Sequence, residues 1–226
     1  MKSRIVVGDV ERSAALDYAE LLRAGAGAAS DAIGKRGALS QAMRPMTSHR
    51  RFAGRAVTVL CEPNDNLVPY AALAYLRAGD VAVIATGGCG ATTALLGGII
   101  TGHMRNIGVA GIVTDALVRD IDEIEALGIP LFAAGAISSA PTKHGSGTIG
   151  LPVMIGGALV MTGDAIVADR DGITSIPMDD AAAAILGLAA IYTKEAGASA
   201  VIKGGALEPT WLGELRRDIT FVPAAG

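Results

Sequence analysis

Cysteine, aromatic residues and positive charge are all scarce in this sequence. Cys61 and Cys89 are the only cysteines among 226 residues, too few for a disulfide framework and without the spacing of a zinc site. Aromatic residues make up 4% of the chain, and the formal net charge of −3 argues against a broad phosphate-binding surface. We therefore expect a reducing, cytoplasmic environment and no nucleic acid as the main ligand.

Signals for secretion and membrane insertion are missing from the sequence pattern. Residues 1–20 contain no basic region followed by an apolar core and a small-residue cleavage site. No uninterrupted apolar stretch reaches the roughly 20 residues that span a bilayer. These absences predict a chain with no membrane partner.

Small residues are abundant, with 30 glycines in a composition that is 51% apolar. Close packing of small residues leaves a modest core in each chain, which contacts between subunits would complete. No linker, repeat or low-complexity tract divides the sequence. We therefore expect one α/β domain over residues 1–226, in an oligomer.

Helical and strand patterns are interleaved along the chain. Helices are expected at residues 10–23, 67–78, 93–108, 120–127, from 178 onward and at 208–218. Strands are expected at residues 54–62, 81–86, 111–116 and 129–136, and the segment EPNDN (62–66) carries a turn signal. The last two strands should lie parallel, because a helix connects them. Between residues 150 and 177, short β-branched runs broken by turn residues favour antiparallel hairpins.

This order of elements predicts a layered α/β domain with mixed sheets. A doubly wound nucleotide fold is not indicated, because the glycine-rich segment 87–98 has neither a G-x-x-x-x-G-K-[ST] signature nor a clean G-x-G-x-x-G motif. A glycine-rich turn between a strand and a helix still presents backbone N–H groups to an anion. An anion other than a nucleotide is therefore left open as a ligand.

The segment Arg119–Glu123, with the sequence RDIDE, allows two interpretations. In the first, Asp120 is the N-cap of a helix and Glu123 is its capping-box partner. In the second, Arg119 and Asp120 lie at the carboxyl end of a buried strand, where open α/β sheets bind ligands. Arginine grips carboxylates through paired hydrogen bonds, and aspartate is a natural Mg²⁺ ligand. The two interpretations are compatible.

Four segments of the sequence carry a family resemblance. They are ASDAIGKRGALSQAMRPM (29–46), GRAVTV (54–59), GVAGIVTDALVRDIDEIEALGIPLFA (108–133) and GDAIVADRDGITSIP (163–177). They resemble the family that joins the divalent-metal-dependent 4-hydroxy-4-methyl-2-oxoglutarate / 4-carboxy-4-hydroxy-2-oxoadipate aldolases with the regulators of ribonuclease activity, formerly labelled menaquinone methyltransferases. The resemblance runs from about residue 28 to about residue 195.

The resemblance implies a three-layer β/β/α swivelling-type domain with mixed sheets that assembles into a homotrimer or homohexamer. It implies an active site shared between subunits, and we expect the helices of 178–218 to pack at a subunit interface. The implied cofactor is Mg²⁺ or Mn²⁺, and the implied substrate is a small 2-oxo acid.

Site residues follow from the same resemblance. Arg119 would hold the substrate carboxylate and stabilise the developing enolate, and Asp120 would be the direct protein ligand of the metal ion. Backbone N–H groups near Gly98 and Ile99 would bind the same carboxylate.

Two further acidic residues match the family. Glu123 matches the last residue of the R-D-x-x-[DE] pattern of the aldolase branch and would belong to the catalytic set. Glu195 resembles an acidic residue that a neighbouring subunit contributes to substrate binding.

Gly98 departs from the aldolase pattern. The aldolases carry a carboxylate twenty-one positions before the arginine of R-D, where it binds metal-associated waters and supports proton transfer. A glycine side chain can do neither, and general acid–base help is typically worth a factor of about 10²–10⁴ in rate. The candidates to compensate are Asp115, Thr92, Thr93 and His103.

The loop 138–150 and the later turns hold other polar side chains. His144 is either an acid–base group or a solvated histidine, and Lys143 is either a contact for substrate charge or a surface lysine. Asp164, Asp169 and Asp171 form a carboxylate cluster, which the turn signals TGD and RDG favour as turns.

Two function classes follow. The first is a metal-dependent lyase of the class II pyruvate aldolase type that cleaves a 4-hydroxy-2-oxo dicarboxylic acid to pyruvate, with oxaloacetate decarboxylation through the same enolate. The second is a non-catalytic ring that binds a protein partner such as a ribonuclease. Glu123 favours the lyase, and Gly98 weighs against it.

Overall fold

The computed structural model describes residues 5–10, 16–88 and 90–220, in two compact units, Met1–Leu188 and Ala189–Gly226. Among the described residues of the larger unit, a nine-stranded mixed sheet has the order β1-β10-β3-β4-β6-β8-β2, with β13 and β14 extending from β3. Its strands are β1 (Ile5–Val7), β2 (Arg44–Pro45), β3 (Phe52–Cys61), β4 (Asp80–Ala85), β6 (Gly111–Thr114), β8 (Leu131–Ala133), β10 (Gly147–Ile149), β13 (Ala165–Asp169) and β14 (Gly172–Ile176). Strands β3, β4, β6 and β8 are mutually parallel. Strands β10 and β13 pair antiparallel with β3, β2 pairs antiparallel with β8, β1 pairs parallel with β10, and β14 pairs antiparallel with β13.

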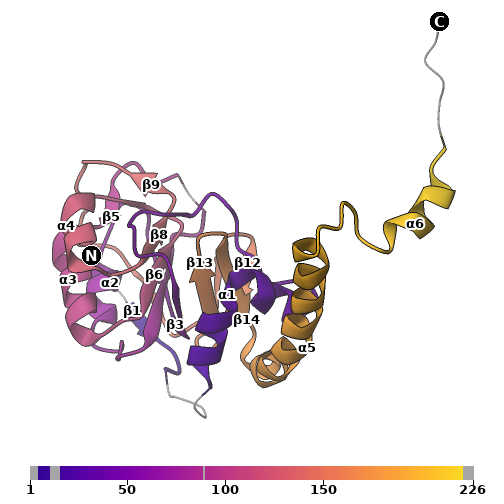
Figure 1. The fold of residues 1–226 in the computed structure, drawn as a ribbon. Helices are drawn as coiled ribbons and strands as arrows, with labels where there is room; N and C mark the ends of the chain where they lie inside the picture. The colour runs from indigo at the N-terminus through magenta and orange to yellow at the C-terminus, as the bar shows by residue number, and fades with distance from the viewer. Residues whose placement is uncertain (1–4, 11–15, 89, 221–226) are drawn as a thin grey trace, which may run out of the picture. The chain divides into compact units, whose positions relative to one another are not determined.

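Two small sheets and six helices complete the chain that is described (Figure 1). The small sheets are β5 (Ala94–Leu96), β7 (Leu117–Val118) and β9 (Gly135–Ala136), all parallel, and the antiparallel hairpin of β11 (Val153–Ile155) and β12 (Ala158–Val160). The helices are α1 (Tyr18–Ala32), α2 (Leu67–Ala72), α3 (Gly98–Ile107), α4 (Ile121–Leu127), α5 (Met178–Lys203) and α6 (Leu212–Leu215), with a 3₁₀ turn at Arg216–Asp218.

The main sheet is buried on both faces, because its strands alternate side chains between two cores. In β3, Val57 and Val59 face the core that α2, α3 and α4 cover, whereas Ala56 faces the core beneath the hairpin β11–β12. The result is hairpin, sheet and helices in successive layers, and the expected three-layer β/β/α class with mixed sheets is confirmed.

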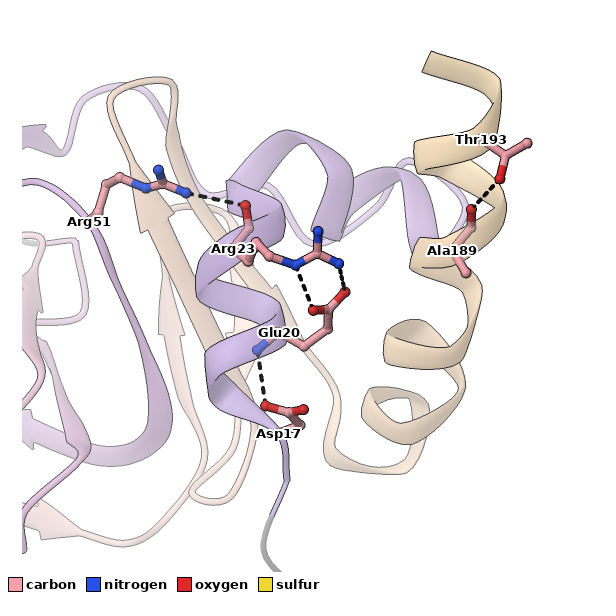
Figure 2. Close-up of polar contacts among 6 residues, drawn as sticks. All are labelled: Asp17, Glu20, Arg23, Arg51, Ala189 and Thr193. Atoms are coloured by element: carbon pink, nitrogen blue, oxygen red, sulfur yellow. Dashed lines mark hydrogen bonds and ion pairs between the residues drawn. The ribbon is translucent and has the colours of Figure 1, made fainter. Parts of the chain in front are cut away.

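Helix α1 is fixed at its start by local polar contacts (Figure 2). The Asp17 carboxylate accepts the backbone N–H of Glu20 at 3.0 Å, and Glu20 pairs with Arg23 at 2.6 Å. The Arg51 guanidinium donates to the carbonyl of Leu22 at 2.7 Å. The helix expected at residues 10–23 therefore begins at Tyr18 and continues to Ala32; residues 11–15 lie outside the described chain.

Several expected boundaries are corrected by the structure. The helix expected at 93–108 is strand β5 followed by α3, because Gly97 is extended and ends the strand. The helix expected at 67–78 ends at Ala72, and turns lead to β4. The strand expected at 129–136 is split into β8 and β9. The parallel pairing of β6 with β8 and the two hairpins are confirmed.

Helix α5 continues from the first unit into the second. Thr193 donates its hydroxyl to the Ala189 carbonyl at 2.9 Å within this helix (Figure 2). By length and composition α5 could cross a membrane, although Lys194 and Glu195 interrupt its apolar run, so no uninterrupted apolar stretch of that length is present in it. One such helix is weak support for a span, because helices of soluble proteins pass the same test. Packing of 178–218 at a subunit interface stays a prediction.

Gly111 provides a test of core packing. A Cβ atom at Gly111 would lie 2.6 Å from the ring of Phe52, which packs edge-on against Phe132. We expect Gly111→Ala to lower the free energy of unfolding by about 1–3 kcal/mol through overpacking, measured by urea denaturation. Gly102→Ala is the control, because its Cβ would meet only Leu127 at 3.9 Å, and alanine raises helix stability by about 1 kcal/mol. Equal effects of the two substitutions would contradict this packing.

Candidate functional site

The small parallel sheet β5-β7-β9 places the expected site residues beside one another. Leu96 pairs with Val118 at the carboxyl ends of β5 and β7. Gly97 and Gly98 follow the first strand, and Arg119 and Asp120 follow the second. Arg119 and Asp120 therefore lie at the carboxyl end of a strand and meet the start of α3 there, but this strand is β7 of the small sheet and not the strand expected at 111–116.

Asp120 joins the first turns of two helices. It occupies the N-cap position of α4 in the left-handed conformation, with φ 61° and ψ 41°, and its side chain makes no capping bond to α4. Its Oδ2 atom instead accepts the N–H of Gly98, the first residue of α3, at 3.0 Å. The capping-box interpretation of Asp120 and Glu123 is therefore wrong. A left-handed non-glycine residue costs on the order of 1 kcal/mol, so the surrounding contacts hold it in place.

Arg119 lies against the same carboxylate. Its Nε atom is 3.4 Å from Oδ2 of Asp120, and both side chains are about one-third exposed. Because Arg119 has five N–H donors and this contact uses one nitrogen, donors remain for a ligand. The N–H groups that follow Gly98 in the first turn of α3 have no acceptor within their helix, as at every helix start. Arginine and helix terminus together form an anion-binding corner.

Gly97 and Gly98 let two carboxylates approach the start of α3. A Cβ atom at Gly97 would lie 2.5 Å from Oδ2 of Asp120. A Cβ atom at Gly98 would collide with the carboxylate of Glu123. The carboxylate of Glu123, from the first turn of α4, therefore lies beside position 98, where the sequence lacks an acidic group. The sequence match of Glu123 to the R-D-x-x-[DE] pattern pointed to this residue but not to its location.

A cavity of about 160 Å³ opens in front of Arg119 and Asp120. Gly97 and Ile99 line it beside these two residues, and Asn66, Tyr70 and Lys143 are also in its lining. A water molecule in the liquid takes up about 30 Å³, so the cavity fits a small molecule rather than a nucleotide. A larger and more open hollow of about 770 Å³ is lined by His49, Arg50 and Arg170 among others, and it contains none of the expected site residues.

The segment Glu62–Asn66 after β3 holds the loops around this cavity. The Asn64 side-chain oxygen accepts the N–H groups of Thr92 and Thr93, at 2.7 and 2.9 Å. The Asp65 carboxylate accepts the N–H of His144 at 2.6 Å. Glu62 accepts the hydroxyl of Ser146 at 2.6 Å. The residues of this segment predict only a turn. The signal for its role at the site was the run of polar residues at the carboxyl end of a buried strand.

Asp65 is a buried carboxylate that remains ionised. Burial alone would raise the pKa of Asp65, but hydrogen bonds from the His144 and Leu67 amides and the Thr142 hydroxyl outweigh it and hold the pKa below its usual value. A carboxylate with a lowered folded-state pKa stabilises the fold above its unfolded-state pKa. That stability is lost as the pH falls through the folded-state pKa.

The residues proposed to compensate for Gly98 lie elsewhere. Asp115 accepts the N–H and hydroxyl of Thr86, at 2.8 and 3.0 Å, and Thr92 and Thr93 are bound to Asn64. His103 is exposed on α3. None of these candidates lines the cavity; Glu123 does not line it either, but it lies against Gly98 at the start of α3.

The remaining polar candidates have structural explanations. Asp164 accepts the N–H groups of Met161 and Met178 in a turn, and Asp169 closes the hairpin β13–β14, so the turn interpretation of this cluster is confirmed. Burial raises the pKa of Asp164. Glu195 is exposed on α5 in the second unit, and its contribution across a subunit boundary stays a prediction.

The cysteines give no metal or redox site in the described chain. Cys61 is buried, and burial together with nearby carboxylates raises its pKa to about 12, so its thiol is protonated at neutral pH. Cys89 lies outside the described residues. The described residues hold no group of three or more His, Cys, Asp or Glu side chains arranged for a metal. Asp120 and Glu123 still fit Mg²⁺, which uses one or two carboxylates and otherwise waters.

Comparison with known proteins places the chain in a family. Residues 26–174 match the family model RraA-like, described as Aldolase/RraA. The chain belongs to the RraA-like family. A protein of Halalkalibacterium halodurans provisionally named 4-hydroxy-4-methyl-2-oxoglutarate aldolase is 38% identical over 149 residues, which is 66% of this chain and 70% of that protein. A Burkholderia mallei protein with the same provisional name is 36% identical over 143 residues, 63% of this chain and 84% of its own.

Solved structures of the RraA-like family share this fold. The RNA-processing inhibitor RraA of Thermus thermophilis has a TM-score of 0.61 and 32% identity, covering 66% of this chain and 89% of its own. RraAS2 of Streptomyces coelicolor, described as an unusual member of the RNase ES inhibitor RraA family, has a TM-score of 0.73 and 25% identity, covering 84% and 98%. The resemblance found in the sequence is thus confirmed, and the family spans both names.

The hydrogen bonds to Asp65 predict a pH-dependent stability in this RraA-like chain. We expect Asp65→Asn to lower the free energy of unfolding at pH 7 by about 1–3 kcal/mol, because an amide nitrogen in place of Oδ2 cannot accept the partly buried hydrogen bonds from Thr142 and His144. The difference from wild type should shrink as the pH falls below about 4, the ordinary pKa of an aspartate in the unfolded chain, and on through the lower folded-state pKa of Asp65. Urea denaturation at several pH values measures it, with the exposed Asp171→Asn as control. A difference that does not change with pH would refute the assignment.

Proposed function

We propose that this chain is a divalent-metal-dependent lyase that cleaves a 4-hydroxy-2-oxo dicarboxylic acid and releases pyruvate. The observation that carries the proposal is the location of the Glu123 carboxylate, in the space that a side chain at position 98 would take. The missing acid was the main sequence argument against catalysis. We propose that Glu123, an acid that the aldolase branch also carries, serves at this place without a second acid at position 98.

Substrate binding is assigned to the corner between β7 and α3. The Arg119 guanidinium and the first-turn N–H groups at Gly98 and Ile99 would hold the carboxylate of the 2-oxo acid. Arg119 is in contact with Asp120, so the two charges keep each other oriented before a ligand arrives.

Asp120 is the proposed direct ligand for Mg²⁺ or Mn²⁺. When bound there, the ion would polarise the 2-oxo group and so favour the enolate that C–C cleavage leaves behind. Glu123 would orient a water molecule and move the proton that converts the enolate to pyruvate. Glu195 of a neighbouring subunit is the further acidic residue of the proposed trimeric or hexameric enzyme. Oxaloacetate decarboxylation would follow from the same enolate.

A second candidate is a non-catalytic ring that binds a protein partner, such as a ribonuclease. The likeness to the RNA-processing inhibitor RraA of Thermus thermophilis, at 32% identity, favours it. In this case Arg119 and Asp120 would have only a structural role. Both candidates are proposed to act in the cytoplasm.

Pyruvate release from 4-hydroxy-4-methyl-2-oxoglutarate with Mg²⁺ or chelator tests the lyase. We expect chelator and Asp120→Asn each to reduce kcat/KM by at least about 10²-fold, because chelator removes the metal ion and the substitution weakens its protein ligand. Glu123→Gln should reduce kcat by about 10²–10⁴-fold, because it removes the acid–base group but keeps the side-chain volume. The neighbouring Asp122→Asn, on an exposed side chain of α4, is the control.

Gly98→Asp is the reciprocal test of the same geometry. Because a side chain at position 98 would collide with Glu123, we expect this substitution to lower activity in the wild-type background. In a Glu123→Gly background, Gly98→Asp should recover part of the lost activity, because the double variant has its acid at position 98 and free space at position 123. A wild type that binds Mg²⁺ but releases no pyruvate would instead favour the protein-binding ring.

A further inference from the structure

We propose that Asn66 and Lys143 form the subsite for the distal half of a dicarboxylic substrate. The Lys143 ammonium would hold the second carboxylate, and the Asn66 side-chain oxygen would accept a hydrogen bond from the substrate hydroxyl. This inference rests on the proposed function, which assigns the first carboxylate to Arg119.

Asn66 has a buried acceptor that the protein does not use. The residue is 7% exposed and lines the same cavity as Arg119. Its Oδ1 atom has no hydrogen-bond partner in the described chain, and its side chain does not cap α2, although it stands at the N-cap position. An unpaired buried acceptor costs about 1–3 kcal/mol, and an apolar residue of similar size would avoid this cost. A ligand hydroxyl in the cavity would provide the missing donor.

Lys143 supplies a second positive charge at this cavity. Its Nζ atom lies 4.9 Å from the centre of the Tyr70 ring, and Tyr70 is also in the cavity lining. A cation over an aromatic face is held in place while its N–H donors stay available, because a ring offers no strong acceptor. The side chain is exposed, so it can bind a group that enters from solvent.

Asp65 holds both residues on the same frame. Its carboxylate accepts the N–H of His144 at 2.6 Å and the hydroxyl of Thr142 at 2.7 Å, the residues on either side of Lys143. The backbone N–H of Asn66 donates to the Thr142 carbonyl at 3.0 Å. The loop around Lys143 is therefore anchored beside Asn66, and this anchoring distinguishes Lys143 from a lysine on a free surface loop.

The charges in the cavity lining indicate the class of ligand. Arg119 and Lys143 are its two cationic side chains, Asp120 is its carboxylate, which the proposed function assigns to the metal ion, and Asn66 adds a neutral hydrogen-bonding group. A short dicarboxylate with a hydroxyl group satisfies the two cations and Asn66. A monocarboxylate such as pyruvate would use Arg119 alone.

Substrate comparison tests Lys143. The probes are 4-hydroxy-4-methyl-2-oxoglutarate, a dianion, and 4-hydroxy-2-oxopentanoate, a monoanion with the same hydroxyl position. We expect Lys143→Met to lower kcat/KM about 10- to 100-fold for the dianion and less than about threefold for the monoanion. Lys203→Met, an exposed lysine at the end of α5, should change neither. Equal losses for the two substrates would overturn the assignment.

Asn66→Leu tests the hydroxyl contact and separates it from a structural role. The substitution should lower kcat/KM for both hydroxylated probes by about tenfold and leave oxaloacetate decarboxylation unchanged, because oxaloacetate has no hydroxyl at this position. The free energy of unfolding should stay equal or rise, because an unpaired acceptor is removed. A loss of stability, or equal loss for oxaloacetate, would overturn the role of Asn66.

Binding measurements test the subsite even if the chain cleaves no substrate. Calorimetry with Mg²⁺ would compare 2-oxoglutarate, which has two carboxylates, with pyruvate. We expect Lys143→Met to weaken 2-oxoglutarate binding about 10-fold or more and to leave pyruvate binding unchanged. Failure of cleavage alone would overturn the lyase, whereas 2-oxoglutarate binding that Lys143→Met does not weaken would overturn the subsite.

Discussion

The hydrogen bond from the Gly98 N–H to the Asp120 carboxylate, 3.0 Å long, organises the candidate site. It joins the starts of α3 and α4, two helices that pack against each other, and places a negative charge where both helix dipoles are positive. The geometry needs a left-handed Asp120 and no side chain at Gly97, whose Cβ atom would lie 2.5 Å from Oδ2 of Asp120. The conformational cost at Asp120 is thus coupled to the position of its carboxylate, and a glycine at the N-cap of α3 is required by that position.

Local sequence patterns predicted the elements better than the contacts between them. The alternation in β3, the strand–helix–strand order around α4 and the turn residues of the hairpins each act over a few positions, so β/α order and layering followed. Asp120 was correctly placed at a helix start. Its partner was not predictable from spacing, because Gly98 lies 22 positions away and meets it only through the pairing of β5 with β7.

Residues 62–66 show the same limit more strongly. Proline, asparagine and aspartate are common in turns, and the pattern correctly predicted a turn there. A turn signal does not show which segments its side chains will bind, and here they bind residues 92–93 and 142–146. Asn66 was missed for the same reason: only the folded chain shows that its acceptor is buried and unpaired.

The charge balance of the corner connects its geometry to the proposed chemistry. Arg119, Asp120 and Glu123 together carry one net negative charge when all are ionised, which suits a divalent cation. With that cation the corner becomes positive, which suits the carboxylate of a 2-oxo acid and its enolate. Glu123 supplies the second negative charge from α4, with its carboxylate beside Gly98. A side chain at position 98 would require the flexible end of Glu123 to move, so the two positions are coupled at this corner.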